Sequence, residues 1–128
     1  EAAVAKVKLG ATLGSLSAPE NAATIIILEA ILTFLLVTTI FAVAVDKRGP
    51  KNIYGFAIGL TVCFDILCAG TFTGASMNPA RSFGPALIGG HWDIHHCYWI
   101  GPILGGVLAA LVYDRIIIGK DGGGGDED

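Results

Sequence analysis

The sequence has few charged residues, which narrows the classes of protein to consider. Charged residues make up 15% of its 128 residues and hydrophobic residues 53%, whereas soluble domains carry about 25% charged residues. Four of the eleven acids lie in the last eight residues, so without that segment the net charge of −3 becomes +1. The body lacks the basic clusters that nucleic-acid binding requires and the high charge of a disordered chain. A nucleic-acid partner is therefore not expected.

Cysteine is also scarce, and familiar catalytic motifs are missing. The three cysteines are an odd count with no CxxC spacing, which signals neither a disulfide framework nor a zinc site. The run from His91 to Cys97 (HWDIHHC) has no recognised ligand spacing, so a metal or pH-sensing cluster is the weaker interpretation of it. No phosphate loop, nucleophile elbow or persuasive Ser/His/Asp arrangement is present. The sequence predicts no enzyme activity, no metal and no cofactor.

Long apolar runs dominate what is present. They cover residues 22–45, 53–73 and 98–118. The first run would form a helix about 36 Å long at 1.5 Å per residue, enough to cross a hydrocarbon core of about 30 Å. The sequence thus predicts an all-α integral membrane protein with three transmembrane helices, surrounded by membrane lipid. Residues 1–21 are expected to form an extramembrane loop, and the acidic, Gly-rich residues 119–128 a disordered tail.

The basic residues predict an orientation. The loop at 46–52 holds three of them, and Arg115 and Lys120 flank the end of the third run. With three spans these two segments lie on one side, which the positive-inside rule makes cytoplasmic. Lys6 and Lys8 disagree with this assignment. The aromatic residues at the start of the third run fit an interfacial belt; they are Trp92, Tyr98 and Trp99.

Residues 74–90 are too short and broken to span a membrane, but they contain a helix signal. Asn78 is a good N-cap and Pro79 suits the first helical position. A helix over 79–88, ended by Gly89 and Gly90, would be about 15 Å long, half a bilayer. The segment therefore predicts a re-entrant half-helix that begins near the membrane midplane.

The residues at that N-terminus suit a pore. A helix N-terminus carries about half a positive charge, Asn78 adds an amide donor, and Arg81 adds a fixed cation. An arginine inside a membrane segment is costly and points to function. Together they describe the wall of a pore for neutral polar solutes. In the alternatives, Asn78 is only a helix cap and Arg81 only pairs with an acid.

Here the sequence resembles a known family. The segment GASMNPARSFGPAL, with the Glu-bearing run ILEAILTFLLV before it and HWDIHHCYWIGP after it, is similar to the C-terminal half of aquaporins, the major intrinsic proteins. The resemblance extends from about residue 22 to 118, and FDILCAG is most similar to the aquaporin-8 and tonoplast intrinsic protein types. It implies the second half of an inverted repeat.

The resemblance implies particular pore residues. Asn78, Pro79 and Ala80 form the signature motif, and Ile66, Ala75 and Arg81 correspond to three positions of the selectivity filter. The resemblance implies a passive water channel. Water-selective members carry His where Ile66 stands, so with Ile66 and Ala75 the constriction is expected to be wider and less polar on that side, which makes ammonia and hydrogen peroxide further candidate solutes. Glycerol is less favoured because Ser82, and not Asp, follows Arg81.

Two acids lie inside the apolar runs. We expect the carboxylate of Glu29 to accept N–H groups of the irregular loop, which lack other partners in hydrocarbon. For Asp65 we expect a structural hydrogen bond or a buried contact. The alternative for both is proton relay. Glycine pairs at 55/59 and 101/105 predict close helix packing.

A half of an inverted repeat cannot enclose a pore alone. We therefore expect this chain to be part of a longer polypeptide that lies in the plasma membrane or in an intracellular membrane such as that of the vacuole, and the family resemblance implies a homotetramer. An antiparallel dimer of half-length chains fits poorly, since it would put one basic loop on each side. A non-conducting assembly or adhesion protein with the same packing is the alternative function.

Overall fold

The computed structural model describes residues 10–50 and 52–119, which form helices and loops with no strands. Three of the helices are long and apolar enough to cross a membrane: Pro19–Val45, Tyr54–Thr73 and Cys97–Ile118. These bounds lie within three residues of the three apolar runs. The all-α prediction with three membrane-spanning helices is confirmed. The expected tail at 119–128 lies, except for Gly119, outside the described residues.

The first span has three parts. A 3₁₀ turn, Pro19–Asn21, leads into helix α2, Ala22–Ile40, which continues as the π-helical segment Phe41–Val45. The threonines in this span do not break it, since Thr33 and Thr39 donate their hydroxyls to the carbonyls of the residues four positions earlier. Such internal bonds satisfy polar groups in an apolar surrounding.

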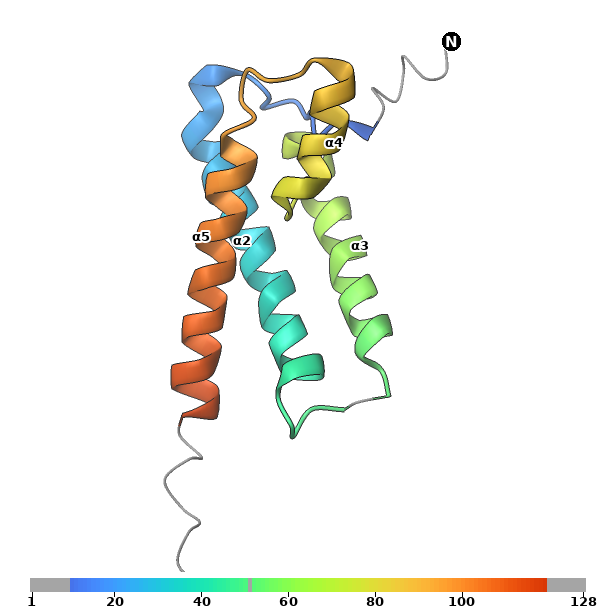
Figure 1. Ribbon diagram of the computed structural model, residues 1–128, viewed down its shortest axis with the longest axis vertical. Helices are drawn as coiled ribbons and strands as arrows, with labels where there is room; N and C mark the ends of the chain where they lie inside the picture. Colours follow the sequence, from blue (N-terminus) through green and yellow to red (C-terminus); the bar gives the residue numbers. More distant parts are fainter. Residues whose placement is uncertain (1–9, 51, 120–128) are drawn as a thin grey trace, which may run out of the picture.

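The other spans are helix α3, Tyr54–Thr73, and helix α5, Cys97–Val112, which continues as the π-helical segment Tyr113–Ile118. Between them lies the short helix α4, Pro79–Gly89, which ends at Gly90 with a left-handed φ of 72°. In Figure 1, α4 begins near mid-height of the bundle and returns to the end where α3 finished. It has the length and course expected of a re-entrant half-helix.

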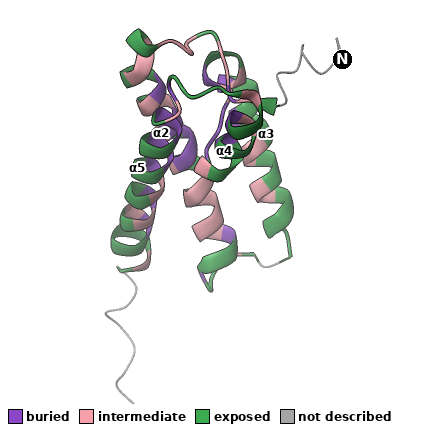
Figure 2. Ribbon diagram, turned by 45° about the horizontal axis from the view of Figure 1, so that its top comes forward, coloured by how far each residue is buried: buried purple, intermediate pink, exposed green. Residues whose placement is uncertain are grey.

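The core is concentrated at one end of the bundle. Helix α2 packs along α5, and α3 lies beside α2. Figure 2 shows that the buried residues gather where α2, α4 and α5 meet, while most of α3 is exposed. A helix with large apolar residues on its surface needs lipid or further protein around it, as the membrane assignment requires.

Glycines explain the close contact of α2 with α5. A Cβ on Gly101 would lie 2.7 Å from the Cβ of Glu29, and one on Gly105 would lie 2.1 Å from the carbonyl oxygen of Ala30. Only glycine allows this approach. The prediction of close packing is confirmed for this pair, whereas a Cβ on Gly55 or Gly59 would meet nothing within 4 Å in the described parts of the chain.

Candidate functional site

The loop between α3 and α4 has an unusual backbone. Gly74 ends α3 with a φ of 87°, and a Cβ there would lie 2.6 Å from the Cα of Thr12. Ala75 and Met77 then adopt φ values of 43° and 55°. Positive φ is uncommon for residues with side chains and persists only where the surroundings hold the backbone in place. Such strain is typical of functional loops.

Glu29 holds this loop from α2. Its Oε1 accepts the hydroxyl of Thr73 at 2.7 Å and the backbone N–H of Ser76 at 2.9 Å, and its Oε2 accepts the N–H of Met77 at 2.8 Å. The carboxyl group is fully buried. The loop N–H groups thus bond to Glu29 as the sequence led us to expect. Both oxygens of the carboxylate accept hydrogen bonds that fix the loop.

Asn78 caps α4. Its Oδ1 accepts the N–H of Ala80 at 2.9 Å, and Pro79 occupies the first helical position. Since the oxygen is engaged with the helix, the NH₂ group is the donor that Asn78, an exposed residue, can offer to a solute. Ala80 is exposed beside it.

Arg81 lies against the beginning of the same loop. Its Nη1 donates to the carbonyl oxygen of Gly74 at 3.3 Å, and the residue is exposed. Within residues 10–50 and 52–119, no carboxylate lies within ion-pair distance of Arg81. The guanidinium is therefore positioned by a backbone carbonyl, and its charge is not neutralised by an acid of the described chain.

The three positions that the resemblance assigns to a selectivity filter differ in their exposure. Ile66 is 41% exposed on α3, and Arg81 is exposed on α4. Ala75 is fully buried and packs with Leu32 and Met77. In this structure Ala75 fixes the shape of the loop, while the side chains of Ile66 and Arg81 are open to an adjacent space.

Asp65 behaves differently from Glu29. It is fully buried on α3, and neither of its carboxyl oxygens has a hydrogen-bond partner in the described part of the chain. Of the two outcomes expected for it, the structure shows the buried contact and lacks the hydrogen bond.

A chain of hydroxyl groups supports the loop and was missed by the sequence analysis. The Oγ1 of Thr12 lies 2.8 Å from the Oγ of Ser82, which lies 2.5 Å from the Oγ of Ser76. Ser76 donates in turn to the carbonyl oxygen of Asn78 at 2.8 Å. The signal available was two small hydroxyl residues on either side of the helix N-terminus, six positions apart.

Tyr98 was assigned wrongly to an interfacial belt. It is only 2% exposed, and its hydroxyl donates to the carbonyl oxygen of Thr73 at 2.7 Å. Trp92 and Trp99, by contrast, are 45% and 44% exposed. Tyr98 therefore helps to hold the loop in place, since its buried side chain reaches the last residue of α3.

The loop between α4 and α5, residues 90–96, carries an aromatic cluster around His95. The ring of His95 lies 4.9 Å from that of Trp92 and 6.1 Å from that of Phe83, which is on α4. The indole N–H of Trp99 donates to Nε2 of His95 at 3.0 Å. Burial, together with the neighbouring His96, lowers the pKa of His95 from its ordinary value of 6.5. No group of three metal-ligating side chains occurs among the described residues.

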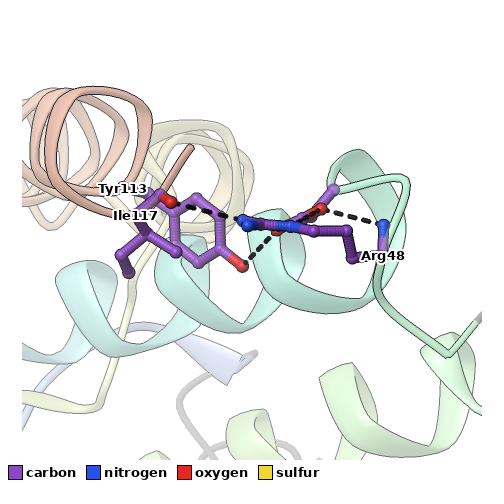
Figure 3. Close-up of polar contacts among 4 residues, drawn as sticks. Arg48, Tyr113 and Ile117 are labelled. Atoms are coloured by element: carbon purple, nitrogen blue, oxygen red, sulfur yellow. Dashed lines mark hydrogen bonds and ion pairs between the residues drawn. The ribbon is translucent and has the colours of Figure 1, made fainter. Parts of the chain in front are cut away.

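A second polar cluster closes the opposite end of the bundle (Figure 3). Arg48 forms an ion pair with Asp46 at 2.8 Å and donates to the carbonyl oxygen of Ile117 at 3.3 Å. The hydroxyl of Tyr113 donates to Asp46 at 3.1 Å. The hydrogen bonds that Arg48 and then Tyr113 donate to Asp46 hold the pKa of that carboxyl group well below its usual range. The cluster fastens the loop after the first span to the end of the third.

The fold and the loop agree with the comparison to known families. The chain belongs to the major intrinsic protein family, whose model matches residues 2–113. The resemblance to aquaporins that the sequence motifs indicated is therefore confirmed.

Among its curated relatives are tonoplast-type aquaporins of plants. The chain is 51% identical to aquaporin TIP1-2 of Zea mays over 115 residues, covering 87% of this chain and 45% of the relative. It is 54% identical to the probable aquaporin TIP3-2 of Arabidopsis thaliana over 95 residues, covering 73% and 36%. The chain thus spans about half the length of the curated relatives it matches.

Proposed function

We propose that this chain supplies the C-terminal half of a passive water channel. The observation that carries the proposal is the loop from Gly74 to Asn78, which Glu29 holds in a strained form before the N-terminus of α4. Irregular backbone at membrane depth is tolerated where it is buried or lines a watery cavity. The relatives named as aquaporins support the same function.

The geometry suggests how such a pore selects its solutes. The amide NH₂ of Asn78 donates to a water oxygen, while the positive end of the α4 dipole opposes cations and protons. Arg81 adds a full charge on the same wall, close to the loop carbonyl that it contacts. Neutral molecules that accept hydrogen bonds are favoured, and cations are repelled.

Removal of the Arg81 charge tests this proposal. The protein that contains this chain is reconstituted in liposomes, and water flux is measured by light scattering after an osmotic shift. We expect Arg81→Val to keep water flux within about two- to threefold while raising the flux of urea or protons about tenfold, a change of roughly 1.4 kcal/mol in the barrier. Leu87→Ala, at an exposed position of α4, is the matched control and should change neither flux.

Solutes beyond water form the finer part of the proposal. Ile66 is apolar and exposed, so the constriction beside it lacks a polar group on that side and suits ammonia and hydrogen peroxide as well as water. We expect Ile66→His to lower ammonia flux about tenfold and water flux about two- to threefold, because a polar, bulkier ring both narrows the path and offers a competing hydrogen bond. Equal losses for the two solutes would contradict this role of Ile66.

The remaining proposals concern the whole protein. We place it in an intracellular membrane such as that of the vacuole, in line with its tonoplast-type relatives. Loop 46–52 and the C-terminus are proposed to face the cytoplasm, and the family relationship supports a homotetramer. A non-conducting assembly or adhesion protein is the competing function; liposomes that show no water flux above protein-free controls would favour it.

A further inference from the structure

Thr12 reaches the proposed pore loop from a distant part of the chain. It lies in the segment before the first span and is only 5% exposed. That segment is fastened to α3, since the N–H groups of Ser15 and Leu16 donate to carbonyl oxygens in the last turn of α3 at 2.8 and 3.0 Å. The backbone of Thr12 lies against Gly74, on which a Cβ would lie 2.6 Å from the Cα of Thr12. Thr12 therefore has a fixed position at the beginning of the loop.

The side chain of Thr12 contacts the other end of the loop. Its Oγ1 lies 2.8 Å from the Oγ of Ser82, in the first turn of α4, and the Oγ of Ser82 lies 2.5 Å from that of Ser76. Ser76 and Ser82 are each 1% exposed. Because these hydroxyl groups are buried, a hydrogen bond between them is stronger than at a surface, and its loss is more costly.

The number of available protons gives this chain of hydroxyl groups a direction. Each hydroxyl group has one proton to donate. Ser76 donates to the carbonyl oxygen of Asn78, so its Oγ accepts the proton of Ser82. Since the proton of Ser82 is then engaged, its Oγ accepts from Thr12. The hydrogen bonds thus run one way, from Thr12 through Ser82 and Ser76 to Asn78.

The chain ends on the backbone that orients the side-chain amide of Asn78. Both peptide groups of this residue bond to the hydroxyl of Ser76: the carbonyl oxygen of Asn78 accepts at 2.8 Å, and its N–H donates at 3.4 Å. Ser82 adds its backbone N–H to the same carbonyl oxygen at 3.3 Å. The side-chain Oδ1 is held by the N–H of Ala80. With these contacts in place, the NH₂ group of Asn78 has a set direction.

We propose that Thr12 is a positioning residue for the side-chain amide of Asn78 and acts through Ser82 and Ser76. The inference rests on the proposed function, in which this amide donates to a passing solute. A functional group selects by geometry when the residues behind it hold it in place. Loss of the Thr12 hydroxyl leaves Ser82 without its donor and loosens the backbone of Asn78. Water flux then falls, and its margin over the flux of urea narrows.

Two substitutions of Thr12 separate this role from packing. Thr12→Val keeps the shape of the side chain and removes the hydroxyl, whereas Thr12→Ser keeps the hydroxyl and removes the methyl group. The protein that contains this chain is reconstituted in liposomes, and water and urea fluxes are measured per incorporated protein. We expect Thr12→Val to lower the ratio of water flux to urea flux about three- to tenfold, as one lost buried hydrogen bond would. Thr12→Ser should keep the ratio. A packing role predicts the reverse order of the two variants.

A double variant tests whether the effect passes through Ser82. Ser82→Ala interrupts the chain one step nearer to Asn78 and should lower the flux ratio at least as much as Thr12→Val. Since the chain is then already broken, adding Thr12→Val to Ser82→Ala should cause little further change. Thr24→Val, the same substitution at an exposed position of α2, is the matched control and should change neither flux.

Circular dichroism checks that each variant is folded, and Ser82→Ala interrupts the same chain if Thr12→Val does not fold. An unchanged ratio in Thr12→Val and Ser82→Ala, equal losses in Thr12→Val and Thr12→Ser, or effects that multiply in the double variant would overturn the inference. The water flux of the wild type would still support the proposed function in each of these cases. Wild-type liposomes without water flux above protein-free controls would overturn both.

Discussion

His95 illustrates how a single ring nitrogen can make the loop between α4 and α5 sensitive to pH. Its Nε2 accepts the indole N–H of Trp99, so this nitrogen carries no proton in the folded protein. Burial and His96 lower the pKa of His95 below its ordinary value of 6.5. The unfolded chain therefore takes up the proton more readily. The stabilisation by His95 is complete above about pH 6.5 and is lost as the pH falls through the lowered pKa.

Tryptophan fluorescence measures this directly, because both tryptophans of the chain contact His95. We expect the emission of Trp92 and Trp99 to change on acidification with a midpoint below pH 6.5, as the imidazolium loses the Trp99 bond. His95→Gln should have a flat profile over the same range. A midpoint at or above pH 6.5, or the same transition in His95→Gln, would show that another group is responsible.

At the same scale, two buried acids show how far the sequence alone could predict the candidate site. Glu29 and Asp65 give the same signal, an acid in an apolar run. The partners of Glu29 could be anticipated, because a loop with free N–H groups had to lie near the midplane. The outcome for Asp65 depends on how α3 is rotated against α2, which no local pattern encodes. The support given by Tyr98 was missed for the same reason.

At the scale of elements, two adjacent glycines on α5 differ in whether the packing against α2 requires them. A Cβ on Gly105 would overlap the backbone of Ala30, whereas a Cβ on Gly106 would meet Val37 and Thr33 at 3.7 and 3.8 Å, ordinary contact distances. We expect Gly105→Ala to destabilise the bundle by about 1–3 kcal/mol, because α2 and α5 must separate. Gly106→Ala should be neutral or stabilising by up to about 1 kcal/mol, since alanine is the better helix former.

Thermal unfolding in detergent, followed by circular dichroism, compares these two variants with the wild type. If both lose equal stability, close approach of α2 and α5 at Gly105 is not what the glycine provides. The spans themselves were predictable, because a helix that crosses the hydrocarbon core must be about 20 residues long and mainly apolar. The π-helical ends after Ile40 and Val112 carried no signal in the sequence. Both lie next to the cluster of Asp46, Arg48 and Tyr113, whose contacts join segments that are far apart in the chain.

At the scale of the whole molecule, the remaining question is which end of the bundle faces the cytoplasm. The bond from Arg48 to Ile117 shows that the loop after the first span and the end of the third span lie at one end, while α4 and the loop between α4 and α5 lie at the other (Figure 1). The positive-inside rule predicts a cytoplasmic position for the first of these ends. Substituted cysteines can decide between the two orientations, since Lys47 and His91 are exposed at opposite ends.

The experiment uses the protein that contains this chain in sealed membrane vesicles whose cytoplasmic face points outward. Cys63 and Cys68, which are exposed on α3, are first replaced by alanine, and the buried Cys97 is kept. We expect a membrane-impermeant maleimide to label Lys47→Cys in intact vesicles and His91→Cys only after permeabilisation, since the reagent cannot cross the bilayer. The reverse pattern would put the basic loop in the lumen. The cluster around His95 would then face the cytoplasm, and its transition below pH 6.5 would report cytoplasmic acidification instead of the pH of the lumen.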